Sequence, residues 1–307
     1  MRAVDPASYS IANFKRTGWR FLRRIVQGRV GVCSASAPPA TTGPASTPRR
    51  PCSLWANMRL MRGRVWEIDF LRGIAVIAMV LYHFSYDLAY FAHLFDVRFF
   101  WSGLGLNIGR VIGGTFIFLA GLSLTLSYRR RVSSQLPRQK LFQKYLGRGV
   151  RIFSYGLLIT LATWVLVPEG IIVFGVLHLI GASIVLAYPF LRFRLPNVAL
   201  GVGCIAAGLY LSTLRTDQPW LVWLGLRPDF STLDYWPVFP WFGVILLGVF
   251  VGNVLYGGEK RATLGPAPEV AGVRPLTFLG RHSLPVYLAH QPVLIATLVL
   301  LGVAKIP

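Results

Sequence analysis

The sequence has few charged residues and very few acidic ones. Only 11 of its 307 residues are Asp or Glu. Charged residues make up 14% of the chain, against about 25% in an average soluble domain. Hydrophobic residues, in contrast, make up 54%. This composition excludes an ordinary water-soluble domain and indicates a protein that resides in a bilayer.

Cysteines are also scarce. Cys33, Cys52 and Cys204 lie far apart in the chain, so they form neither a disulfide framework nor the close spacing of a metal site. We therefore expect no metal. The sequence also shows no Gly-rich phosphate loop and no internal repeat of the kind found in many transporters.

The formal net charge of +21 does not indicate a nucleic-acid partner. Binding to nucleic acid would need a basic face on a soluble domain with a recognisable motif, and neither is present. The Lys and Arg residues lie instead in residues 1–64 and between apolar segments. This distribution predicts membrane lipids as partners and basic loops that set topology.

Residues 1–64 carry eleven Arg, one Lys and a single acidic residue. The run at 34–48 is rich in Ser, Ala, Thr and Pro, a composition that cannot bury enough apolar surface to fold. We predict a basic, disordered N-terminal tail, with an Arg-rich interfacial helix at 11–33 as an alternative. Translation from Met58 or Met61 is a further alternative, in which the tail is not made.

The rest of the chain contains seven apolar segments. A helical crossing needs about 20 apolar residues, and most of the segments approach or exceed this length. The sequence therefore predicts an all-α, polytopic transmembrane bundle with about seven spanning helices, in one domain at 65–305. The segments are 67–91, 104–127, 150–167, 171–191, 196–214, 238–256 and 277–303.

Basic loops alternate with non-basic loops along these segments. The loop at 128–151 holds eight Lys or Arg and no acidic residue, whereas the loop before it is slightly acidic. The positive-inside rule then predicts a cytoplasmic N-terminus, an external C-terminus and a location in the cell membrane. The basic loop could also dock the phosphates of a cytosolic donor.

The first apolar segment carries four ionisable residues, Asp69, Arg72, His83 and Asp87. Their intervals of 3, 11 and 4 place them on one face of a helix. Ionisable side chains in a span cost about 2.5–3.5 kcal/mol each on insertion scales, so this face should point into the bundle. Arg72 should lie near the cytoplasmic end, with His83 about 16 Å further along.

These residue types suit acyl transfer. The imidazole of His83 can take a proton from an attacking hydroxyl or amine, and Asp87 can orient the ring. Arg72, with Asp69 beside it, suits the phosphates of coenzyme A. The structural alternative is an interfacial ion pair between Asp69 and Arg72, with His83 bonding between helices.

Four blocks carry a resemblance to a known family. They are residues 67–87, IVFGVLH at 172–178, DYWPVFPWFG at 234–243 and LGRHSLPVYLAH at 279–290. In this order they resemble the bacterial branch of the heparan-α-glucosaminide N-acetyltransferase catalytic-domain family, over about residues 62–303. The spacing of Arg72 and His83 is also similar to the Arg-x10-His signature of transmembrane acyltransferases.

This resemblance implies acetyl-coenzyme A as the donor and a sugar or glycan as the acceptor. It leaves the catalytic histidine open between His83 and His93, because the eukaryotic branch has its implicated residue in the loop that follows the first helix. His290 matches a family histidine of the last block, where Tyr287 also lies. His178 lies at a depth similar to that of His83, so a shared outward-facing pocket is expected to include it.

The expected function is therefore a membrane acyltransferase that transfers acetyl to an oxygen or nitrogen of a sugar. The alternative is a transporter or flippase of a polar or lipid-linked solute, because buried Arg, His and Asp also line permeation paths. A non-catalytic scaffold is a third reading. It would leave the ionisable face of the first helix without a role.

Overall fold

The computed structural model describes residues 65–132, 137–167, 170–230, 232–256 and 272–304. The predicted N-terminal tail, residues 1–64, lies outside these residues. The described part is a bundle of helices, which confirms the predicted fold class.

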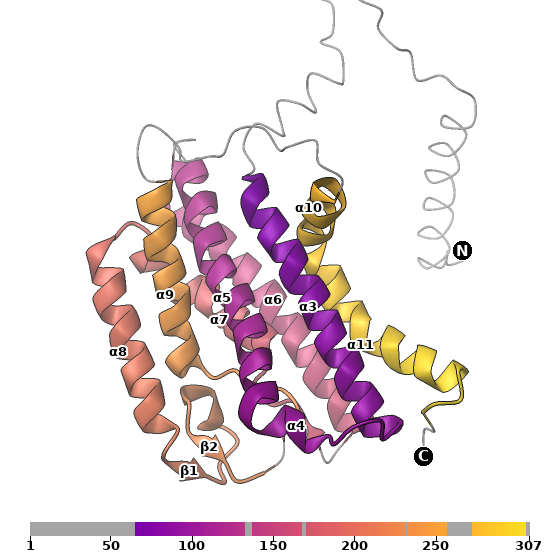
Figure 1. The fold of residues 1–307 in the computed structure, drawn as a ribbon. Coiled ribbons are helices and arrows are strands. Elements are labelled where there is room, and N and C mark those ends of the chain that lie inside the picture. The colour runs from indigo at the N-terminus through magenta and orange to yellow at the C-terminus, as the bar shows by residue number, and fades with distance from the viewer. Residues whose placement is uncertain (1–64, 133–136, 168–169, 231, 257–271, 305–307) are drawn as a thin grey trace, which may run out of the picture. The chain divides into compact units, whose positions relative to one another are not determined.

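Among the described residues, five helices are long and apolar enough to cross a membrane, and two shorter apolar helices pack with them. Successive helices run up and down the bundle (Figure 1). The long helices are α3 (Trp66–Phe91), α5 (Gly103–Val132), α6 (Arg138–Leu166), α9 (Val238–Leu255) and α11 (Ser283–Leu300). The shorter two are α7 (Val176–Leu186) and α8 (Leu195–Leu211).

The remaining elements are short and lie between these helices. Two short strands pair in parallel in the segment that connects α8 to α9. These short elements are the helices α4 (Arg98–Trp101), η2 (Tyr188–Phe190), η3 (Val222–Leu224) and α10 (Val273–Arg281) and the strands β1 (Arg215–Thr216) and β2 (Arg227–Pro228).

Several predicted bounds differ from the structure. Helix α6 begins at Arg138, twelve residues before the predicted start at 150, so most of the basic loop expected at 128–151 is helical. The segment expected at 171–191 becomes helical only at Val176, because the residues before it are extended and Phe174 accepts a hydrogen bond from the backbone of Trp236 (2.9 Å). The last segment is not one helix. It breaks at His282 into α10 and α11.

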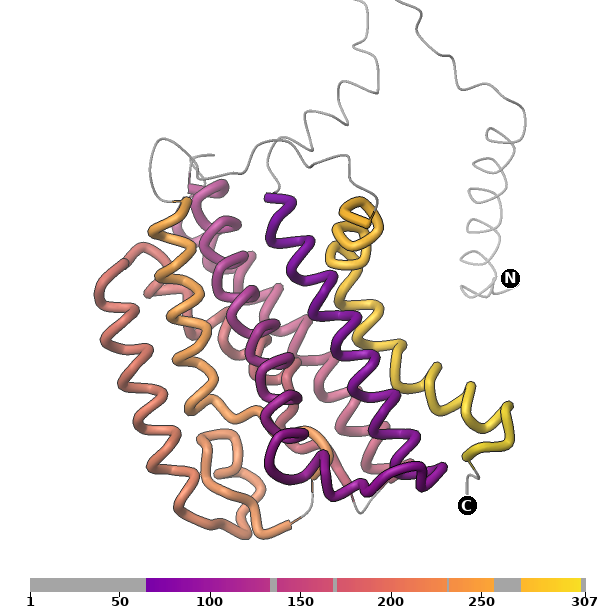
Figure 2. The backbone as a smooth tube through the Cα atoms, viewed as in Figure 1, coloured from indigo at the N-terminus to yellow at the C-terminus, as the bar shows by residue number. Residues whose placement is uncertain are grey.

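One end of the bundle gathers the start of α3, the ends of α5 and α9, and helix α10 (Figure 2). The last segments of the chain, α10 and α11, lie beside α3, the first described helix. Because α3 begins at this end and α11 ends away from it, the two helices run in the same direction (Figure 1).

A buried polar contact closes the same end of the bundle. Asn253 of α9 is fully buried and donates to the carbonyls of Leu191 and Phe193 (3.0 and 2.9 Å). Its own side-chain oxygen accepts from Arg129 of α5 (2.8 Å). These three hydrogen bonds connect the turn between α7 and α8 to helices α5 and α9 and hold that turn in place.

Candidate functional site

The four ionisable residues of α3 lie inside the bundle. Asp69 and Asp87 are 8% and 1% exposed, and Arg72 and His83 are half-buried. The polar face therefore meets neighbouring helices rather than lipid. It divides into two groups, one at the start of α3 and one near its end.

At the start of α3, one carboxylate holds two guanidinium groups. Arg72 Nη1 lies 3.1 Å from Asp69 Oδ1, and Arg281 Nε of α10 lies 3.3 Å from Asp69 Oδ2. Arg72 Nη2 also donates to Ser123 Oγ of α5 (2.6 Å). The ion pair of Asp69 and Arg72 that the structural alternative expected thus forms, and Arg281 joins it from the far end of the sequence.

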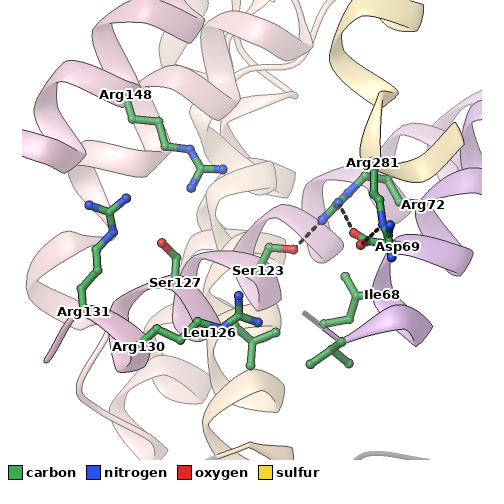
Figure 3. Close-up of a pocket in the computed structure, with 11 residues that line it drawn as sticks. Ile68, Asp69, Arg72, Ser123, Leu126, Ser127, Arg130, Arg131, Arg148 and Arg281 are labelled. Atoms are coloured by element: carbon green, nitrogen blue, oxygen red, sulfur yellow. Dashed lines mark hydrogen bonds and ion pairs between the residues drawn. The ribbon is translucent and has the colours of Figure 1, made fainter. Parts of the chain in front are cut away.

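These residues border a cavity of about 350 Å³, here called the arginine pocket. Asp69 is the acidic residue of its lining, so the pocket is strongly cationic. Figure 3 shows Arg131 and Arg148 on one side of the space and the two arginines around Asp69 on the other. The arginines of the lining come from α3, α5, α6 and α10: Arg72, Arg130, Arg131, Arg148 and Arg281.

The second group lies between α3 and α11 and is here called the imidazole cluster: His83, Asp87, His290 and Gln291. The rings of His83 and His290 meet edge to face with centroids 4.9 Å apart. Asp87 Oδ1 accepts a hydrogen bond from Gln291 Nε2 (2.8 Å). Two helices from opposite ends of the sequence thus build one polar centre within the apolar bundle.

A backbone carbonyl contacts the ring of His83. His83 Nδ1 lies 2.9 Å from the carbonyl oxygen of Met79. A carbonyl oxygen can only accept, so Nδ1 carries the proton of the neutral ring and Nε2 has the basic lone pair. Asp87 bonds to Gln291, and its predicted role as orienter of His83 remains a prediction.

His178 is not part of this cluster. Its Nδ1 accepts the backbone N–H of Gly175 (3.2 Å), which caps the start of α7. Its Nε2 lies 3.4 Å from the hydroxyl of Thr160, which itself donates to Ile172. The rings of Phe153 and Phe174 also contact His178. Both ring nitrogens have partners, an arrangement typical of a structural histidine.

The remaining predicted residues lie around the two groups. Tyr287 of α11 packs against the core and offers its carbonyl to His290 Nδ1 (2.6 Å). His93 is exposed in the loop after α3 and has a left-handed backbone with φ 52°, a conformation that His adopts more readily than most residues. It lies ten residues beyond His83, past the end of the helix.

Asp234, in the segment before α9, is a partly buried acidic residue to which the sequence analysis assigned no role. Its carboxylate accepts the backbone N–H of Val176 (3.2 Å) and the indole N–H of Trp236. Burial raises the pKa of Asp234 to about 6, although both hydrogen bonds lower it. This residue therefore fastens the segment before α9 to the first turn of α7.

Gln291 and Arg281 were also missed. The signal for Gln291 is present, since it is a polar residue next to His290 in an apolar run, and such residues cost free energy unless they have partners. Arg281 lies within the predicted segment 277–303, where the sequence names no partner for its charge. Only the packing of α10 against α3 brings it to Asp69.

Residues 64–292 match the catalytic-domain model of heparan-α-glucosaminide N-acetyltransferase. The chain belongs to this family. No curated protein matches the chain. The matched region of this N-acetyltransferase-family protein begins just before α3 and ends within α11. It therefore includes the arginine pocket and the whole imidazole cluster.

Proposed function

We propose that this protein is an integral membrane acetyltransferase that takes acetyl from acetyl-coenzyme A and transfers it to a sugar or glycan. Membership of the acetyltransferase family supports the reaction class. The observation that carries the proposal is the placement of the arginine pocket and the imidazole cluster on one face of one helix, α3.

The arginine pocket has the chemistry to hold the phosphates of coenzyme A. A guanidinium group presents a planar fork of donors that matches phosphate oxygens, and it keeps its charge at any physiological pH. Asp69 fixes the direction of Arg72 and Arg281 through the contacts at 3.1 and 3.3 Å. The pocket is thus arranged for an anion that carries several charges.

His83 lies eleven positions after Arg72, about 16 Å along an ideal helix. This distance suits the extended pantetheine arm that separates the diphosphate of coenzyme A from its thioester. A donor with its phosphates at Arg72 would therefore place its carbonyl carbon near His83. The two groups of residues then act on opposite ends of one molecule.

The neutral ring of His83 is arranged to act as a general base through Nε2. In the proposed reaction Nε2 takes the proton of the acceptor hydroxyl or amine while that oxygen or nitrogen attacks the thioester carbonyl. The C–S bond then breaks, and the departing sulfur takes the proton back from His83. The products are the acetylated acceptor and the free thiol. His93 remains the alternative base.

We place the arginine pocket on the cytoplasmic side of the cell membrane and the end of α11 outside. The end of α5 and the start of α6 carry many of the basic residues, as the positive-inside rule requires of a cytoplasmic end. The donor would then enter from the cytoplasm, and the acceptor would reach His83 from the other side. Contacts with anionic lipid headgroups are expected around the same basic loops.

The test is transfer of radiolabel from acetyl-coenzyme A to amino sugars and glycans by the purified full chain in lipid nanodiscs. His83→Ala should abolish transfer, whereas His282→Ala, at an exposed imidazole bonded to Phe278, should leave it unchanged. Full transfer by the His83 variant, together with its loss in His93→Ala, would move the base to His93. Absence of transfer to every acceptor, combined with solute flux in liposomes, would contradict the proposal in favour of a transporter.

A further inference from the structure

Three buried polar atoms of the imidazole cluster have no hydrogen-bond partner among the described residues. They are Asp87 Oδ2, His290 Nε2 and Gln291 Oε1. Buried polar atoms in native proteins nearly always have a partner. Gln291 contacts Asp87 and is the next residue after His290. Three such atoms on these side chains indicate a place where a ligand supplies the missing hydrogen bonds.

The contacts of these side chains fix what kind of partner they need. Gln291 must turn its amide nitrogen to the carboxylate of Asp87 (2.8 Å), which leaves its carbonyl oxygen as the free atom. His290 Nδ1 faces the carbonyl oxygen of Tyr287 (2.6 Å), so this nitrogen holds the proton and Nε2 has a lone pair. With the carboxylate oxygen of Asp87, all three free atoms are acceptors.

The charge of Asp87 is also unbalanced. None of the ion pairs between described residues includes Asp87. The one cation of α3, Arg72, lies fifteen positions earlier, about 22 Å away along the helix. A ligand at this place therefore meets several acceptors and a negative charge, and no nearby cation of α3 would attract an anionic group.

We propose that Asp87, His290 and Gln291 form the acceptor seat, which binds the reactive part of the acceptor through hydrogen-bond donors and selects amine and hydroxyl groups over anionic ones. Gln291 is the specificity-determining residue, because its amide both holds Asp87 and presents an acceptor atom. The proposal rests on the acetyltransferase function above and identifies the side of His83 from which the acceptor approaches. The rings of His290 and His83 are in contact, with centroids 4.9 Å apart, and this contact joins the seat to the proposed base.

The seat can be tested by sugar binding in the absence of any donor. The full chain in nanodiscs would be titrated with glucosamine, glucose and glucuronic acid, with binding measured by calorimetry and by the shift in Tm. We expect glucosamine to bind most tightly, glucose less tightly, and glucuronic acid not measurably. Equal affinity for all three sugars, or binding of none by protein with a normal Tm, would overturn the proposal.

Variants then connect the affinity to the seat. Gln291→Leu should weaken glucosamine binding about tenfold, the effect of about one lost hydrogen bond to a charged or buried group. Gln291→Asn, which keeps an amide, should weaken it less. Gln143→Leu, at an exposed glutamine of α6, is the matched control and should bind like the wild type. Unchanged glucosamine affinity in a folded Gln291→Leu protein would contradict the seat.

These outcomes separate the seat from the enzymatic proposal. If glucosamine binding depends on Gln291 but no acetyl is transferred from acetyl-coenzyme A, the proposed function fails and the seat stands. If acetyl is transferred and Gln291→Leu leaves the KM for the acceptor unchanged, the seat is wrong and the proposed function stands. A seat that binds only the acceptor should also leave the KM for acetyl-coenzyme A unaltered in Gln291→Leu and in Gln291→Asn.

Discussion

A Cβ atom added to Gly280 would lie 1.7 Å from the carbonyl oxygen of Asp69. Helix α10 therefore presses against the first turn of α3 at a point where only glycine fits. A second close approach joins the same helices, since a Cβ on Gly73 would lie 2.0 Å from the carbonyl oxygen of Leu276. Together these contacts set the position of Arg281, the next residue after Gly280, relative to Asp69.

Gly280→Ala should consequently move α10 and weaken the binding of coenzyme A, because Arg281 would leave its place beside Asp69. We expect an increase in Kd of about tenfold, the equivalent of about one charge-assisted hydrogen bond, measured by calorimetry. Gly203→Ala in α8, where a Cβ meets open space, is the control and should keep the wild-type Kd. Identical affinities in the two variants would show that α10 does not position the pocket.

Arg72→Lys should raise the KM for acetyl-coenzyme A by about tenfold, with a smaller change in kcat. Lysine keeps the charge but cannot make the paired contacts of guanidinium with Asp69 and Ser123. Initial-rate kinetics at varied donor concentration would measure the change. The control is Arg98→Lys, an exposed residue paired with Asp96 outside the pocket. A KM that does not move in Arg72→Lys would argue against phosphate binding by Arg72.

His178→Ala should reduce the free energy of unfolding rather than impair transfer. The change removes the cap of α7 and empties space between Phe153 and Phe174, a loss of about 2 kcal/mol or more. We expect a lower Tm, and a kcat near the wild-type value when it is corrected for the folded fraction. A normal Tm with abolished transfer would instead return His178 to the substrate pocket.

Asp234 should make stability depend on pH. Burial raises its pKa from 3.8 to about 6 in the folded protein, so the folded state binds the proton more tightly than the unfolded state does. The contribution to stability is complete below about pH 3.8 and is lost as pH rises through 6. The Tm of the wild type should therefore fall relative to that of Asp234→Asn between pH 4 and 7. A constant difference in Tm across this range would contradict the shifted titration.

Much of the fold could be predicted from the sequence, because the apolar segments that form the helices are continuous stretches of the chain. Apolar runs of sufficient length predict helices. The described part of the chain contains seven apolar helices where seven segments were expected, and five of them are long enough to cross a membrane. The start of α6 was placed twelve residues too late, because its first turns are rich in basic residues and read as a loop. The start of α7 was placed five residues too early. The cause is a tertiary contact, the pairing of Phe174 with Tyr235, which no local pattern records.

The site was predictable only where one helix contains it. The periodicity of α3 was enough to bring Asp69, Arg72, His83 and Asp87 to one face. The partners from other helices, Arg281 and Gln291, depend on how α10 and α11 pack beside α3. The capping role of His178 likewise depends on Gly175 and Thr160, and its apolar surroundings in the sequence do not reveal it.

The placement of both polar groups on the single continuous helix α3 has a further consequence for substrate choice. A rigid helix keeps the distance between Arg72 and His83 constant, so this distance does not adjust to the molecule that spans it. The protein should therefore select donors by their length. A truncated thioester without the nucleotide would lack the phosphates that bind at Arg72, and an acyl phosphate would be too short to contact both Arg72 and His83. The identity of the acyl group should matter less than the length of the tether that carries it.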